Sequence, residues 1–150
     1  MSIKTKIHAL AGIIGFLTIL IFWISTAFSE LFSSHETITA VKTMILRGMF
    51  ILIPAMIVVG ASGMNLGRKR KDAQAISKKK RMPFIAANGL LILLPAADYL
   101  QSKAVAGEFD VIFYSVQLVE LAAGAINLTL MGLNIRDGRS MARRRKKITG

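Results

Sequence analysis

Residues 111–134, VIFYSVQLVELAAGAINLTLMGLN, decide the fold of this chain because they are long enough to cross a bilayer as one helix. Polar and small residues recur in this stretch at spacings of three and four, which places them on one helix face. The residues on that face are Tyr114, Gln117, Glu120, Gly124, Asn127, Met131 and Asn134. A carboxylate and several carboxamides in line cannot face lipid, so we expect this polar stripe to face other helices or a polar cavity.

The composition of the whole chain indicates a membrane protein. Its 150 residues are 53% hydrophobic, the mean hydropathy is +0.54, and the formal net charge is +12. The basic residues gather in blocks between apolar runs, which does not indicate a nucleic-acid surface, and we expect no nucleic-acid partner. The chain has no cysteine, so disulfides, thiolate ligands and cysteine nucleophiles are excluded. Its first apolar run is longer than that of a cleavable signal, so we expect it to remain as a span.

Four segments reach spanning length, at residues 7–28, 41–66, 83–100 and 111–134. Basic residues lie at the N-terminus, in the loop 67–82 and in the tail 135–150, while the other two connections are acidic. The positive-inside rule therefore places both termini and the basic loop in the cytoplasm. We expect one all-α domain over residues 1–150, an integral membrane four-helix bundle with both ends inside.

Charged and amide residues inside the spans predict two contacts between helices. Arg47 lies about 9 Å below the outer edge of its span and Glu120 about 13 Å below its own, with Gln117 in between. We expect Arg47 and Glu120 to pair, either to lock two helices together or to relay protons or hold a quinone or cofactor edge. Asn88 and Asn127 are predicted at similar depth, where a hydrogen-bonded pair fixes helix register.

Heme is the one cofactor for which the sequence offers ligands, because P-loop, GxSxG and HExxH motifs are all absent. His8 is followed on the same face by Gly12 and Gly15, which leaves room for a flat macrocycle. Axial partners for an iron held by His8 are a methionine near the same level or His8 of a second copy. The methionines are Met64, Met82 and Met131, and on the outer side His35 is expected near Met44 and Arg47, which would pair with heme propionates. The alternative is that these residues are interfacial anchors and apolar filler.

Two resemblances bear on this choice. The opening Ile-His-Ala-Leu-Ala-Gly resembles the first-helix histidine segment of small four-helix b-type cytochromes, which implies heme b. Such families usually carry paired histidines in several spans, and spans two to four of this chain contain none. The segments SELFSSHETITAVK, RMPFIAANGLLILLP and AINLTLMGLNIRDG resemble small four-span proteobacterial inner-membrane proteins, which implies a bacterial inner (plasma) membrane but no activity.

Three functions are compatible with these patterns. The first is a b-type-cytochrome-like or quinone-linked electron-transfer protein. The second is a non-catalytic accessory or assembly subunit of a membrane complex, and the third is a small dimeric solute or ion permease. Small-residue patches at residues 60–63 (GASG) and 122–125 (AAGA) predict a homodimer. The basic blocks predict contact with anionic lipid headgroups.

Overall fold

The fold is a bundle of long antiparallel helices. A computed structural model describes residues 2–68 and 72–149, with side chains given as far as residue 144. The elements are α1 (Ile3–Phe32), α2 (His35–Gly67), α3 (Ala73–Asn88), a π-helical turn η1 (Gly89–Leu93), α4 (Leu94–Val105) and α5 (Val111–Thr149). Because α3, η1 and α4 run on continuously, the described residues form four helices long and apolar enough to cross a membrane. The expected all-α four-helix membrane bundle is confirmed.

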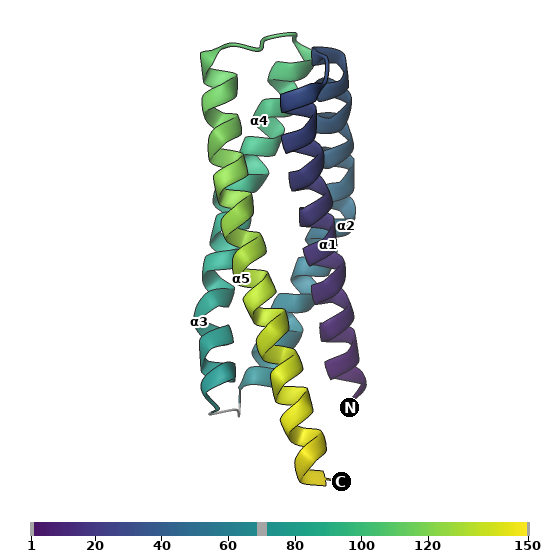
Figure 1. The fold of residues 1–150 in the computed structure, drawn as a ribbon, viewed down its shortest axis with the longest axis vertical. Coiled ribbons are helices and arrows are strands. Elements are labelled where there is room, and N and C mark those ends of the chain that lie inside the picture. Colours follow the sequence, from purple (N-terminus) through teal and green to yellow (C-terminus); the bar gives the residue numbers. More distant parts are fainter. Residues whose placement is uncertain (1, 69–71, 150) are drawn as a thin grey trace.

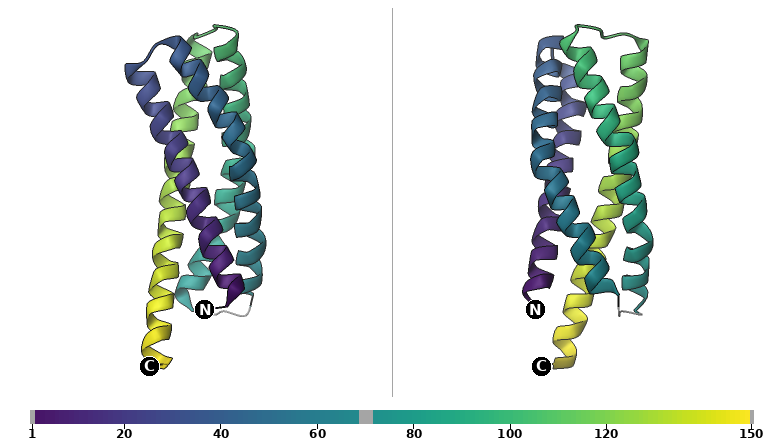
Figure 2. Two further views of the ribbon diagram at one scale, coloured as in Figure 1. Left: turned by 90° about the vertical axis from the view of Figure 1, so that its right-hand side faces the viewer. Right: turned by 180° about the vertical axis from the view of Figure 1, so that it is seen from behind.

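The four spans stand side by side with neighbours running in opposite directions (Figures 1 and 2). α1 packs against α2 and α5, and the third span, made of α3, η1 and α4, packs against α2 and α5 on its other sides. The starts of α1 and α3 and the ends of α2 and α5 lie at one end of the bundle, which we call the basic end. The α1–α2 and α4–α5 connections lie at the opposite end, which we call the acidic end. α5 extends beyond the other helices at the basic end (Figure 1).

The helices are longer than the predicted spans. α1 continues to Phe32 and α2 begins at His35, so only Ser33 and Ser34 connect them where a loop over residues 29–40 was expected. The Ser34 side chain accepts a hydrogen bond from the Thr37 N–H, which caps α2. At the basic end α3 begins within the predicted loop 67–82, of which residues 69–71 lie outside the described residues. The predicted tail 135–150 continues α5 as helix to Thr149.

The third span changes its helical geometry in the middle. The Leu94 N–H bonds back to the Gly89 carbonyl, a five-residue repeat that widens the helix into η1. Pro95 follows directly, and a proline lacks an N–H and its ring crowds the carbonyl one turn earlier. The wider turn therefore accommodates this proline without breaking the span. Gly89, at the start of η1, faces the Asn127 side chain of α5.

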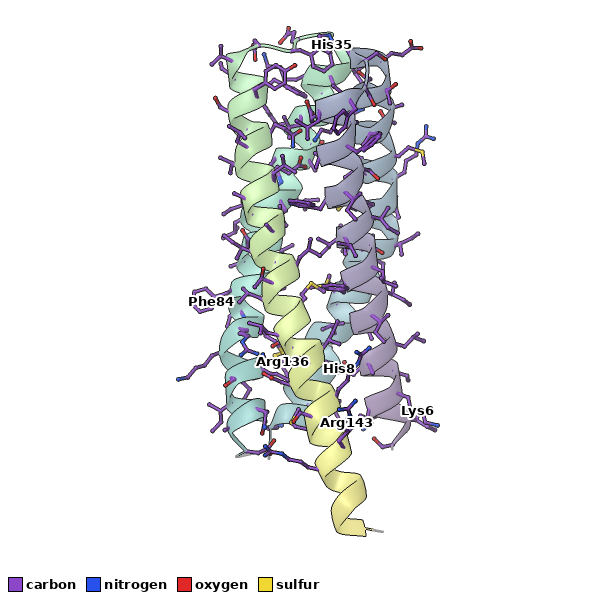
Figure 3. The ribbon with its side chains drawn as sticks, in the orientation of Figure 1. Lys6, His8, His35, Phe84, Arg136 and Arg143 are labelled. Atoms are coloured by element: carbon purple, nitrogen blue, oxygen red, sulfur yellow. The ribbon has the colours of Figure 1, made fainter. Side chains whose placement is uncertain are left out.

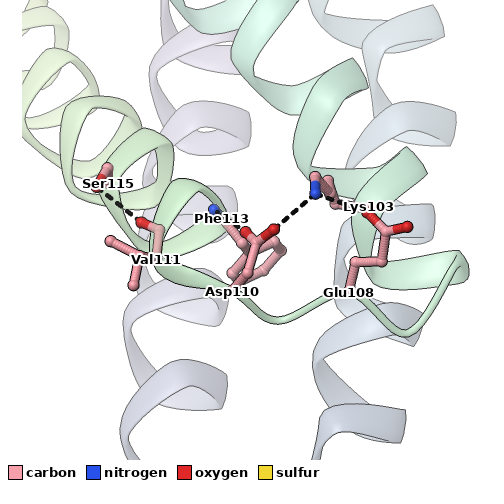
Figure 4. A network of polar contacts seen from close by, with 6 residues as sticks. All are labelled: Lys103, Glu108, Asp110, Val111, Phe113 and Ser115. Carbon is pink, nitrogen blue, oxygen red and sulfur yellow. Dashed lines mark hydrogen bonds and ion pairs between the residues drawn. The ribbon is translucent and has the colours of Figure 1, made fainter.

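The α4–α5 connection is held by a small polar network (Figure 4). Lys103 donates to Glu108 at 2.6 Å and to Asp110 at 2.8 Å, and Asp110 also accepts the Phe113 N–H at 2.8 Å. The hydrogen bond from Lys103, followed by that from the Phe113 N–H, holds the pKa of Asp110 below its usual range. Asp110 thus ties α4 to α5 and caps the start of α5.

Few side chains are buried within the chain, as expected when lipid covers most of the outer surface. One apolar cluster, at the acidic end, consists of Ile38, Leu100, Ala104 and Phe113. The other lies further toward the basic end and consists of Ile19, Ile85 and Met131. Polar side chains of α5 occupy the levels between these clusters, and they define the candidate site.

Candidate functional site

The candidate site is a buried ion pair in the half of the bundle nearer the acidic end. Lys42 Nζ of α2 donates to Glu120 Oε2 of α5 at 2.7 Å, and the side chains are 1% and 12% exposed. Gln117, one turn earlier on α5, donates from Nε2 to the same Glu120 oxygen at 3.0 Å. Two donors therefore converge on one carboxylate oxygen in the interior of a membrane bundle.

Glu120 pairs with Lys42 in place of the expected Arg47, so that pairing was wrong. Lys42 lies at spacings of four and three from Ile38 and Ile45, and all three side chains are buried on one face of α2. Arg47 lies two residues beyond Ile45, on the outward face, and is exposed. Because Ile38 and Ile45 face the interior, Lys42 on the same face of α2 lies inside the bundle.

A second carboxylate belongs to this site. Both carboxylate oxygens of Glu30 are buried and have no hydrogen-bond partner within the described part of the chain. Glu30 interacts electrostatically with Lys42, Glu120 and His35. Glu30 was expected in a loop, but α1 continues past it to Phe32. Thr26 and Ser29 of the same helix are buried as well. We call Glu30, Lys42, Gln117 and Glu120 the ionic cluster.

A small cavity lies beside the ionic cluster. It has a volume of about 50 Å³, and Glu120, Trp23, Ile45, Leu93 and Gly124 are among its lining residues. One water needs on the order of 10–15 Å³ of such space, so this cavity has room for a few water molecules. The indole Nε1–H of Trp23 donates to the Leu121 carbonyl at 2.8 Å and holds the ring against α5. The other lining side chains are apolar except Thr26, so a water in this cavity would find polar side-chain partners only beside Glu120 and Thr26.

The polar stripe of α5 faces inward as expected over most of its length. Gln117, Gly124, Asn127 and Met131 are buried, whereas Tyr114 is exposed and Phe113 takes the inward position instead. The expected contact between Asn88 and Asn127 is confirmed, with Nδ2 of Asn88 2.9 Å from Oδ1 of Asn127.

Both amide nitrogens of this pair also bond backbone carbonyls. Asn88 also donates to the Ala123 carbonyl at 2.8 Å, and Asn127 donates to the Ile85 carbonyl at 3.4 Å. Two helical turns further toward the basic end, Arg81 bonds Asp137 at 2.7 Å and Asn134 at 3.3 Å. These contacts join α3 to α5 at successive levels.

His8 lies near the basic end in a contact with α2 (Figure 3). Its Nδ1 is 2.8 Å from Ser62 Oγ, and the Ser62 hydroxyl donates to the Val58 carbonyl. These contacts hold the His8 ring against α2. A side chain added at Gly63 would meet Met82 Cε at 2.7 Å and His8 Cε1 at 3.2 Å. His8 and Met82 are thus brought together around Gly63.

The other predicted heme residues do not converge on His8. The face of Gly15 is closed by Met56 Sδ at 3.1 Å and Met131 Cε at 3.6 Å, and a side chain added at Gly12 would meet Val59. Met64 is 70% exposed. His35 stacks on Phe109 at the acidic end, about 18 Å along α2 from Arg47 by helical rise. Gly15 is therefore covered by two methionines, whereas Gly12 meets only Val59, at 4.0 Å. Heme b stays a prediction that an absorption spectrum would test.

The small-residue patches predicted to form a dimer interface pack partly inside the chain. Gly124 lies against Trp23, whose Cδ1 would be 2.8 Å from an added side chain, and Gly63 lies against Met82 and His8. Gly60 has open space around it. Two of the glycines therefore serve the contacts of α1 and α3 with their neighbours.

The fold and the ionic cluster define a multi-pass membrane protein of four helices with ionised side chains buried in its interior. Comparison of the chain with protein-family models, with curated proteins and with solved structures finds no match. Among the described residues, no three histidine, cysteine, aspartate or glutamate side chains gather closely enough to hold a metal ion.

Proposed function

We propose that this chain is a small membrane permease that binds protons at the ionic cluster and carries them across the bilayer. One observation carries the proposal: Glu30 buries both carboxylate oxygens without a hydrogen-bond partner beside an already formed Lys42–Glu120 ion pair. Of the three functions expected from the sequence, the permease is the one that this geometry favours. Intramembrane ionisable residues are expensive to bury and usually serve a function.

The charges of the cluster supply the reason. Lys42 already pairs with Glu120, and the Glu30 oxygens have no hydrogen-bond partner among the described residues, so the cluster holds two carboxylates against one lysine. Burying an uncompensated carboxylate is costly, and proton binding removes that cost. Glu30 is therefore the group at which a proton binds, and Glu120 is the group that receives it as Lys42 moves away.

Access to the cluster favours a carrier over an open channel. Glu30 lies two residues before the end of α1, at the acidic end. Toward the basic end, the apolar cluster of Ile19, Ile85 and Met131 closes the interior. A proton taken up from the acidic end can then leave at the basic end only when this apolar layer rearranges.

The experiment is proton flux in liposomes that contain the purified protein and a pH-sensitive dye. A potassium diffusion potential should drive acidification in liposomes with the wild-type protein, and Glu120→Gln and Glu30→Gln should each abolish it. Glu36→Gln is the matched control, since Glu36 is an exposed carboxylate at the same end, and it should retain full flux. Flux equal to that of protein-free liposomes would contradict a proton carrier, and full flux in Glu120→Gln would contradict this site.

The membrane that goes with this proposal is the inner (plasma) membrane of a bacterium, with the basic end in the cytoplasm. The positive-inside rule and the resemblance to proteobacterial four-span proteins support it. Anionic lipid headgroups are the proposed contact of the basic end. Arg136, Arg139 and Arg143 recur at spacings of three and four on α5 and are exposed, and Figure 3 shows two of them on the part of the helix near this end.

A further inference from the structure

Two charged side chains lie on the outward surface of the membrane-spanning helices. Arg47 of α2 and Asp98 of α4 are both exposed, within the spans His35–Gly67 and Ala73–Val105. Their surroundings are apolar, because Met44 and Phe50 of α2 and Leu91 of η1 are also exposed. A charge that faces lipid is costly, so these two side chains require a partner in the membrane.

The two charges lie at nearly the same depth. The Thr39 hydroxyl of α2 donates to the Ala104 carbonyl of α4 at 3.1 Å, which marks one common level. Arg47 lies eight residues, about 12 Å, further toward the basic end, and Asp98 lies six residues, about 9 Å, further. The difference of about 3 Å is well within the reach of an arginine side chain.

Neither charge is neutralised within the chain. The salt bridges formed by the described residues involve Lys42, Arg81, Lys103 and Arg136, and none includes Arg47 or Asp98. An arginine side chain is long enough to extend toward the membrane surface, but the side chain of Asp98 is short. Asp98 lies about 7 Å below Lys103 by helical rise, so its carboxylate cannot reach the acidic end in the same way.

We propose that a second copy of this chain docks on the outward face of α2 and α4, with Arg47 of each copy paired to Asp98 of the other. Both copies insert with the basic end on the same side, so their two-fold axis lies along the membrane normal. Such an axis keeps every residue at its own depth. Arg47 and Asp98 of one copy then lie at the depth of Asp98 and Arg47 of the other, so two equivalent ion pairs form across the axis.

A second copy fits this face better than a lipid does. A lipid phosphate would pair with Arg47, but its negative charge would be repelled by Asp98 at the same level. A second copy supplies a cation for Asp98 and an anion for Arg47 together. This proposal is independent of the proton-binding function, because neither residue belongs to the ionic cluster.

The first test is a charge swap, read out as oligomeric mass in detergent and in membranes. Arg47→Asp and Asp98→Arg should each lose the dimer, because each places like charges opposite one another. The double variant Arg47→Asp with Asp98→Arg restores opposite charges and should restore the dimer. A monomeric wild-type protein, or single variants that remain dimeric, would overturn the proposal.

The second test keeps both charges and uses the absence of native cysteines. Met44→Cys with Ser102→Cys places one thiol a turn from Arg47 and one a turn from Asp98, and oxidation in membranes should give a covalent dimer. Ile24→Cys with Leu118→Cys is the matched control, since both residues are exposed on the neighbouring helices α1 and α5. No covalent dimer from the first pair, or equal yields from the two pairs, would overturn the proposed face even where the charge variants fail to fold.

Discussion

The two polar regions that α5 builds differ in how completely their polar atoms are bonded. The ionic cluster at Glu120 contains a carboxylate, Glu30, whose buried oxygens have no hydrogen-bond partner in the described chain. Two turns further along α5, the pair Asn88 and Asn127 is neutral and bonds both the other amide and backbone carbonyls. A satisfied polar pair fixes the register of helices, whereas an unsatisfied charged group marks a place where something binds.

The largest expected effect comes from breaking the ion pair of the ionic cluster. Lys42→Met leaves Glu120 buried without its cation, and such a loss typically destabilises by about 3–5 kcal/mol. Adding Glu120→Leu removes the orphaned charge and should recover most of that stability. Unfolding of the single and double variants in mixed detergent micelles would measure both. A double variant as unstable as Lys42→Met would show that the pair does not act as a unit.

The next largest effect on stability is expected between the two polar regions, where Gly124 lies against Trp23. Gly124→Ala places a methyl group 2.8 Å from Trp23 Cδ1, and the indole is held by its bond to Leu121. Overpacking of this kind costs about 1–3 kcal/mol. Gly60→Ala is the control, because nothing lies within 4 Å of that position, and it should leave stability unchanged or raise it. Equal melting temperatures for the two variants would contradict the close contact.

A smaller effect is expected in the neutral region. Asn127→Ala removes the bonds to Asn88 and to the Ile85 carbonyl, and interhelical hydrogen bonds in membranes contribute about 0.5–2 kcal/mol each. Proton flux should remain, since the amide pair only positions α3 against α5. Thr129→Ala is the control on the same helix, because its hydroxyl bonds only a carbonyl of α5. Loss of flux in Asn127→Ala with unchanged stability would show that the amide pair takes part in proton transport.

The comparison also shows what the sequence could predict. The inward face of Gln117, Glu120 and Asn127 follows from helical spacing alone, and so does the contact of Asn127 with Asn88. Those residues lie well inside their spans, where polar groups have no alternative to facing the bundle.

The residues that sequence analysis missed lie near the ends of the predicted spans. Lys42 was counted with the outer edge of its span and Glu30 with a loop, because hydropathy does not show that a helix continues past its apolar part. The signal for Lys42 was its spacing of four and three from Ile38 and Ile45. No such pattern revealed that Met56 would fill the space beside Gly15, because that contact depends on how α1 and α2 are rotated against each other.

The smallest expected effect concerns an exposed carboxylate at the acidic end of the bundle. Asp110→Ala removes one of the two partners of Lys103 and the cap on the Phe113 N–H, at an exposed position where water screens the ion pair. Because the pKa of Asp110 is lowered in the folded chain, its stabilisation is complete above the ordinary carboxyl pKa and disappears as the pH falls through the lowered value.

The melting temperature of Asp110→Ala should therefore lie slightly below that of the wild-type protein at neutral pH, and the difference should shrink in acid. Ser115→Ala, at the same end, is the control and should show no such pH dependence, since its hydroxyl bonds only the Val111 carbonyl. Proton flux should not change in either variant. If Asp110→Ala abolished flux as Glu120→Gln does, proton transport would not depend on the carboxylate being buried.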